Sequence, residues 1–188
     1  MRGNASRTVE LQNVAVPGRD LLGQPGDEIW YVFEVIVPYF LVAMAGTYLG
    51  IATAALEEAR AHLTKRRYSL SGTSLVQQPI LQHRLGTLWP EVERTRRLIY
   101  HATVQGNTGE PDAVIALLSA KAEVADCVVH VVNEAMTLTG GIAYRENANL
   151  DRHLRDARAA HAVASTTDLL RTWTGRLFLG LPLLDEGG

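Results

Sequence analysis

The sequence is poor in cysteine, in aromatic residues and in excess charge of either sign. Its 188 residues include one cysteine and 6% aromatic side chains, and the formal net charge is -2. The single Cys127 excludes a disulfide within the chain and is typical of a reducing compartment, so we expect a cytoplasmic protein. The small net charge gives no electrostatic basis for binding nucleic acid. At this length the chain fits one ordinary domain with its own core.

The sequence also lacks the spacing of a metal site and the apolar run of a signal peptide. The 6 histidines are scattered, and no His-x3-His or Glu-x2-His pair faces partner carboxylates, so we predict no metal. Residues 1–20 hold no apolar run, so we expect no signal peptide. The 22 uncharged residues from Val35 to Leu56 are long enough to span a bilayer. Pro38 and several polar residues dilute them, so we expect a buried helix of a soluble bundle and no membrane contact.

Residues 1–26 have the pattern of a strand and loop. In RTVELQNVAV the pairs Val9 and Leu11, then Val14 and Val16, alternate with polar neighbours. The segment that follows, VPGRDLLGQPGDE, is rich in Gly and Pro, as turns are. Because a strand needs a partner, we expect this segment either to pack on the helices or to be the end of a sheet outside the chain.

From Asp27 onward the apolar residues recur at helical spacing. We predict helices at about 28–66, 75–105, 112–138, 149–162 and 165–179, with Pro38 as the place for a kink. The stripe of the third helix holds one polar residue, Lys121, which we place at a rim because a lysine can extend its amine to water. The predicted fold class is all-α: an antiparallel up-down bundle of four to five helices with a short N-terminal β-strand or loop segment.

Several segments combine into a pattern that is more specific than any one of them. They are RTVELQNVAVPGRDLLG, LGIATAALEEARAHLTKRRY, PILQHRLGTL, TLTGGIAYRE and RHLRDARAAH. Their order resembles the acyl-CoA dehydrogenase superfamily of flavoproteins, over essentially the whole chain. The resemblance implies that residues 1–26 are the last strand of a β-domain and a linker, and that residues 27–188 are the C-terminal helical bundle. The family's N-terminal helical domain and most of its β-domain have no counterpart in the chain.

In such enzymes the bundle holds flavin adenine dinucleotide (FAD), partly across a subunit boundary. The resemblance therefore implies FAD as cofactor, with FMN as the alternative. The basic segment after the first helix would bind the pyrophosphate through Arg66 and Arg67, since a guanidinium suits a phosphate diester. Cations at a helix C-terminus are also explained by the helix dipole. In this segment KRRYS replaces the RxxFG that is usual in the family.

The glycine pair at Gly140 and Gly141 would let the backbone approach the cofactor, with Thr137 and Tyr144 beside it. Taken alone, a glycine pair after a helix is most simply a C-cap. Thr137 stands where the family has glutamine, and Ala143 where it has a further glycine. These departures leave the cofactor frame recognisable but altered.

The family's catalytic glutamate has no counterpart in the chain. It aligns with Ala164, or with Phe40 in members that place it on the first long helix. Desaturation of an acyl-CoA requires a base for the α-proton. We therefore expect a reaction of the flavin-dependent hydroxylase or monooxygenase type, whose superfamily members lack the glutamate. His161, one turn before Ala164, and Asp168, one turn beyond it, are the candidate catalytic residues, and the alternative for His161 is a structural or solvent-exposed histidine.

These features predict the C-terminal portion of a flavin-dependent oxidoreductase that contributes FAD-binding and oligomerisation surfaces. The isolated chain should be inactive and bind flavin poorly. Its substrate, a small molecule or an acyl-CoA-type compound, would be held mostly by domains outside the chain. The family's assemblies and the apolar 35–56 helix predict a homodimer or homotetramer. The alternatives are a non-catalytic subunit or assembly domain, and a helical interaction module unrelated to flavin.

Overall fold

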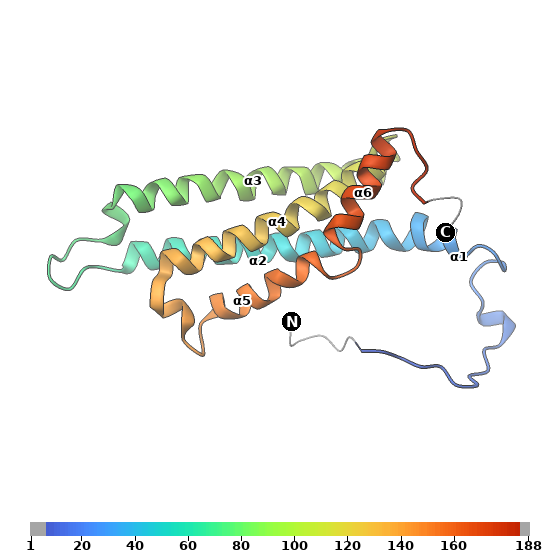
Figure 1. Ribbon diagram of the computed structural model, residues 1–188, viewed down its shortest axis with the longest axis horizontal. Coiled ribbons are helices and arrows are strands. Elements are labelled where there is room, and N and C mark those ends of the chain that lie inside the picture. The colour runs from blue at the N-terminus through green and yellow to red at the C-terminus, as the bar shows by residue number, and fades with distance from the viewer. Residues whose placement is uncertain (1–6, 185–188) are drawn as a thin grey trace.

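A computed structural model describes residues 7–184, and helices make up most of it (Figure 1). The first part holds η1 (Gly18–Asp20), α1 (Glu28–Trp30), the π-helical turn η2 (Tyr31–Ile36) and α2 (Val37–Lys65). Then come η3 (Leu75–Gln77), α3 (Pro79–Thr108), α4 (Ala113–Thr139) and η4 (Gly140–Tyr144). The described chain ends with α5 (Asn149–Arg158), η5 (Ala159–His161) and α6 (Thr167–Phe178).

Successive long helices run in opposite directions along the bundle. In Figure 1, α2, α3, α4 and α5 lie along the long axis, and α6 crosses the end at which α4 begins. Helix α4 is central, because it contacts α2, α3, α5 and α6. The predicted all-α, antiparallel up-down bundle is confirmed.

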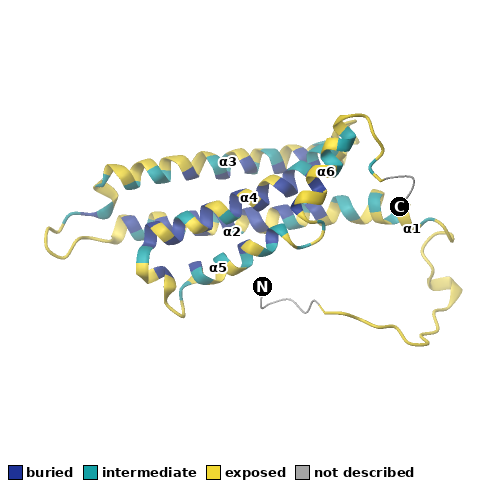
Figure 2. Ribbon diagram, in the orientation of Figure 1, coloured by how far each residue is buried: buried dark blue, intermediate teal, exposed yellow. Residues whose placement is uncertain are grey.

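The core is one cluster of buried side chains around α4, dark blue in Figure 2. Along α4, buried apolar residues run from Leu117 to Leu138, and Val124, Val128 and Val131 are fully buried. Each such side chain contributes about 1.5–3 kcal/mol on burial. On α2, small buried residues occupy the inner face, and they let α2 and α4 pack closely: Ala45, Ala52, Ala55 and Ala59.

The helical stretch Glu28–Lys65 passes the length and composition test for a membrane span. The inner face of α2 is buried from Leu41 to Leu63. Its outer face and its N-terminal end are not covered, and only 28% of the most apolar window is buried. The prediction of a buried helix therefore holds for one face of α2 only.

The same stretch changes its hydrogen-bond pattern just before Pro38. Residues Tyr31–Ile36 form a π-helical turn, after which the amide of Val37 donates to the carbonyl of Val32. Pro38 has no amide hydrogen, and its ring crowds the preceding turn. The irregularity predicted at Pro38 thus takes the form of a widened turn.

Residues 7–26 are exposed and run outside the bundle (Figures 1 and 2). The strand predicted around Val9–Val16 is not formed, since the described residues contain no β-strand and pair only through an isolated bridge between Arg67 and Ser74. The physical reason is that no partner strand lies beside this segment. Residues 1–6 of the predicted N-terminal segment lie outside the described part of the chain.

Candidate functional site

Arg66 and Arg67 directly follow α2. The amide of Arg66 donates to the carbonyl of His62, and its backbone is extended (φ −78°, ψ 134°), so the helix stops there. Both side chains are exposed, and Nη1 of Arg67 donates to the Gly72 carbonyl at 3.2 Å. The two guanidinium groups stand in solvent beside the loop to α3, where a phosphate can reach them.

The end of α4 is set by Gly140. Its backbone has φ 69° and ψ −151°, a conformation nearly restricted to glycine, and its amide donates to the Met136 carbonyl. A Cβ built at Gly140 or at Gly141 would meet nothing within 4 Å. Both glycines therefore leave open space along the backbone, which a ligand could enter.

The polar and aromatic residues beside the glycine pair are also accessible. Thr137 is exposed, and its hydroxyl donates to the Asn133 carbonyl one turn earlier, at 3.0 Å. The Tyr144 ring, at the end of η4, is 73% exposed. Neither side chain is required to fill the core, so both are free to contact a ligand.

The predicted cofactor-binding residues gather at one end of the bundle. Helices α2 and α4 run in the same direction, and Figure 1 shows both ending on the side of the α2–α3 loop. Arg66 and Arg67 after α2, and the glycine turn (Gly140 and Gly141) after α4, thus lie at the same end of the bundle. This end combines exposed cations, open backbone and an exposed ring, a set that fits an elongated ligand carrying a pyrophosphate.

His161 lies in the turn between α5 and α6. Its Nδ1 is 3.0 Å from Oγ1 of Thr167, and its Nε2 is 3.9 Å from Oδ1 of Asp126 on α4. Asp126 also pairs with Arg171 of α6. The imidazole is 30% exposed. Neighbours from two helices orient this ring, and its partial exposure leaves it accessible to a bound molecule.

The other catalytic candidates are less constrained. Asp168 is exposed in the first turn of α6, where a carboxylate is favoured by the helix dipole. The two positions at which the resemblance places a base are also exposed: Ala164 just before this helix, and Phe40, 38% exposed, on α2. The 10 residues of α5, about 15 Å of helix, separate His161 from the glycine-turn end. The structure therefore divides the predicted residues into two separate groups.

Lys121 does not lie at a rim, as its place on the α4 stripe predicted. It is 0% exposed, and its Nζ donates to the carbonyl of Ala160 at 2.7 Å. The prediction was wrong because η5 and α5 cover this part of α4, and a backbone acceptor meets the amine there. The signal in the sequence was one lysine in the middle of an otherwise apolar stripe.

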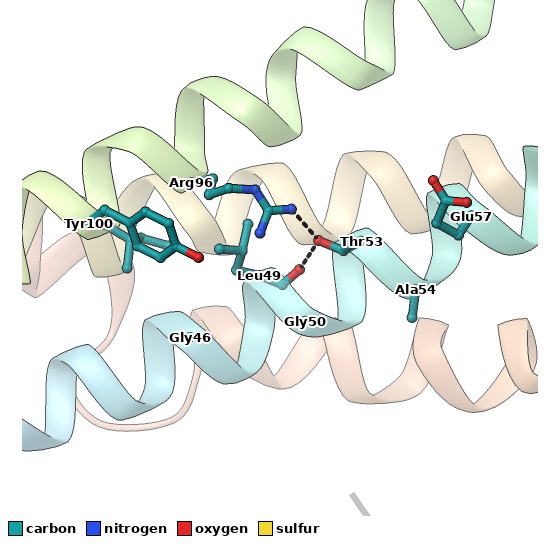
Figure 3. Close-up of a pocket in the computed structure, with 9 residues that line it drawn as sticks. Gly46, Leu49, Gly50, Thr53, Ala54, Glu57, Arg96 and Tyr100 are labelled. Carbon is teal, nitrogen blue, oxygen red and sulfur yellow. Dashed lines mark hydrogen bonds between the residues drawn. The ribbon is translucent and has the colours of Figure 1, made fainter.

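A groove of about 430 Å³ lies between α2 and α3 (Figure 3). Arg96 reaches across it, with Nη2 3.1 Å from Oγ1 of Thr53 and Nε 2.9 Å from a carboxylate oxygen of Glu93. Its lining includes Gly46, Gly50 and Ala54 at four-residue spacing. That spacing was the signal that sequence reasoning missed. The predicted cofactor-binding and catalytic residues lie elsewhere.

Metal-binding side chains do not gather anywhere in residues 7–184. No group of three or more His, Cys, Asp or Glu residues in that range is arranged to hold a metal ion.

Comparison with known proteins identifies relatives for most of the chain. Residues 32–176 match the family described as acyl-CoA dehydrogenase, C-terminal domain. The short-chain specific acyl-CoA dehydrogenase of Megasphaera elsdenii is 30% identical over 178 residues, which are 94% of this chain and 45% of that protein. A glutaryl-coenzyme A dehydrogenase in complex with glutaryl-CoA superposes with a TM-score of 0.84 at 26% identity, over 95% of this chain and 44% of its own.

A structure of PigA with FAD and proline has the same fold, with a TM-score of 0.70 at 20% identity over 77% of this chain and 37% of its own. The chain spans about half the length of the curated relatives it matches, 45% of the Megasphaera enzyme. The curated relative and the glutaryl-coenzyme A enzyme are both named dehydrogenases, and neither is named a hydroxylase.

Proposed function

Because the chain belongs to the acyl-CoA dehydrogenase family through its C-terminal domain, we propose that it is the C-terminal part of a flavin-dependent oxidoreductase. Its contribution is an FAD-binding surface and an oligomerisation surface. The observation that carries the proposal is the shared end of α2 and α4, where exposed arginines and the open glycine turn occur together. Residues 1–26 are then the exit from a β-domain, and residues 27–188 the bundle.

In this proposal FAD supplies reversible two-electron chemistry, and FMN is the alternative flavin. Arg66 and Arg67 would hold the pyrophosphate through charge-assisted hydrogen bonds. Gly140 and Gly141 would admit the cofactor against the backbone, and Thr137 and Tyr144 would flank it. The chain offers one surface for the cofactor, and the remaining contacts would come from other domains or from a second subunit.

The reaction we favour is of the hydroxylase or monooxygenase type. Neither Ala164 nor Phe40 can remove an α-proton, so the chain provides no base at either position that the resemblance indicates. His161 is the candidate that takes or gives a proton, and Asp168 is the second candidate. The substrate is a small molecule or an acyl-CoA-type compound, held mainly by the rest of the protein. The relatives are named dehydrogenases, which favours desaturation instead. The experiment must therefore test whether the protein has a base that removes the α-proton.

A non-catalytic subunit is the second candidate function. The observation that favours it is the same missing carboxylate, with the bundle otherwise kept intact. In either case we propose a cytoplasmic homodimer or homotetramer. The apolar residues exposed along Glu28–Lys65 would be covered in it, and the small residues of the α2–α3 groove would let a helix of a second copy approach closely.

The test uses the chain together with the N-terminal domains that this proposal requires, loaded with FAD. We expect the flavin to keep its visible absorbance when butyryl-CoA is added without oxygen, and Ala164→Glu to bleach it by restoring a base. Ala164→Gln, which has a similar size and no basic oxygen, is the control and should behave like the natural chain.

Bleaching by the natural protein would rule out the hydroxylase preference. Bleaching by the Ala164→Gln control would also argue against a missing base as the cause. An assembly that forms but retains no flavin would favour the non-catalytic subunit.

A further inference from the structure

Lys121 is a charged side chain enclosed in the bundle. It is 0% exposed and is among the largest fully buried side chains. Removing an ammonium group from water is strongly unfavourable unless partners compensate, and an apolar residue of similar size often fills such a position at no loss of stability. Core packing alone therefore does not account for a lysine at this place.

The amine of Lys121 joins three elements. Its Nζ donates to the Ala160 carbonyl of η5 at 2.7 Å and lies 5.6 Å from the ring centre of Tyr48 on α2. Both partners are 0% exposed. Burial lowers the pKa of Lys121, and burial followed by the charge of Asp156 raises the pKa of Tyr48. The contact therefore operates without water, where a hydrogen bond to a charged donor is strong.

Helix α4 holds the turn after α5 from two sides. On the inner side Lys121 binds the Ala160 carbonyl. On the outer side Asp126, also from α4, lies 3.9 Å from Nε2 of His161, the next residue along. Nδ1 of His161 is 3.0 Å from Oγ1 of Thr167 on α6. The direction of the imidazole thus depends on where the Ala160 peptide is fixed.

We propose that Lys121 is a positioning residue: its hydrogen bond to Ala160 fixes the turn and thereby orients the imidazole of His161 between Asp126 and Thr167. The chemical purpose of this arrangement rests on the proposed function, in which His161 exchanges a proton. The positioning itself does not, because every group in it belongs to the chain.

The experiment measures amide hydrogen exchange and the nitrogen NMR signals of the histidine rings in the 188-residue chain, without flavin. Lys121→Met removes the donor and keeps a flexible side chain. Lys121→Gln removes the charge and keeps a donor. Lys65, exposed at the end of α2, is the chain's other lysine, and Lys65→Met is the control. His161→Gln assigns the ring signals.

In Lys121→Met we expect exchange at residues 159–165 to become about tenfold faster, the size of effect that loss of one buried hydrogen bond produces. Exchange in α3 should stay near its natural rate. The ring signals of His161 should change, because the ring no longer meets Thr167 in a fixed direction. Lys121→Gln should restore most of both readouts, and Lys65→Met should alter neither.

The proposal would be overturned if Lys121→Met had the same amide exchange rates and the same His161 ring signals as the natural chain. Equal acceleration in all helices, not reduced in Lys121→Gln, would also overturn it, since it would indicate a general loss of stability. If Lys121→Met does not fold, Lys121→Gln decides: natural readouts support the proposal and altered readouts overturn it. Neither readout involves flavin, so a failure to bind FAD would count against the proposed function and not against this inference.

Discussion

The thiol of Cys127 is 2% exposed on the inner face of α4. Burial raises its pKa from 9.0 to about 11. Because the thiolate is the reactive form, we expect the folded chain to show no measurable reaction with Ellman's reagent (DTNB) at about pH 8. After unfolding in urea, one thiol per chain should react at once. Rapid reaction of the folded chain would show that α4 is not packed in solution as described.

The raised pKa of Cys127 also predicts the direction in which stability changes at alkaline pH. A thiol whose folded pKa is raised keeps a proton that the unfolded chain gives up. The stability that it contributes is complete below pH 9.0 and is lost as the pH rises toward about 11. The free energy of unfolding, measured by urea titration, should therefore fall more steeply over this pH range for the natural chain than for Cys127→Ala. Equal slopes would contradict the assignment.

At the scale of single residues, the sequence predicted the backbone role of a residue better than it predicted how deeply a side chain is buried. It identified the Gly140–Gly141 pair as a helix C-cap, and Gly140 has the positive φ that is typical of such a cap. It misjudged Lys121, because periodicity fixes the side of a helix on which a residue lies but not the depth to which neighbours cover it. The acceptor of Lys121, the Ala160 carbonyl, is 39 positions away in the sequence.

At the scale of elements, the glycine turn offers a matched pair of substitutions. Gly140 has φ +69°, whereas Gly141 has no positive φ, and both have open space where a Cβ would stand. Gly140→Ala should lower the free energy of unfolding by about 1–3 kcal/mol, through backbone strain alone. Gly141→Ala should stay within about 0.5 kcal/mol of the natural chain. Urea titrations followed by circular dichroism measure both.

A Gly140→Ala chain as stable as Gly141→Ala would show that the turn relaxes without strain. In that event the open backbone would not need glycine for its conformation. Close approach of a ligand would then be the only remaining reason for glycine at this position.

The helices themselves followed from the sequence, because apolar spacing and Gly or Pro interruptions determine them locally. The predicted 112–138 helix is Ala113–Thr139, and the predicted 75–105 helix corresponds to η3 and Pro79–Thr108. The strand predicted at Val9–Val16 was wrong because alternating apolar and polar residues favour a strand only when a partner strand is present. The groove between α2 and α3 was missed because two helices form it together, and Arg96 lies 43 positions from Thr53.

At the scale of the whole molecule, the bundle keeps the two groups of candidate site residues apart. The arginines and the glycine turn share one end, and His161 lies beyond α5, about 15 Å of helix away. An elongated cofactor could extend from the first site toward the second, but the chain alone covers only one side of such a path. The exposed outer face of α2 agrees with this, since much of its apolar surface has no cover within the described residues. Further protein would therefore be needed to complete the site that we propose.

Titration of the 188-residue chain with FAD, followed by calorimetry and flavin fluorescence, measures whether the chain alone forms the cofactor site. The chain alone should bind FAD weakly or not at all. Together with the N-terminal domains that the proposed function requires, it should bind FAD tightly, and Arg66→Ala combined with Arg67→Ala should weaken that binding by at least about tenfold, since each guanidinium would lose a charge-assisted bond to phosphate. Tight one-to-one binding of FAD by the chain alone would contradict the proposal that further protein completes the site.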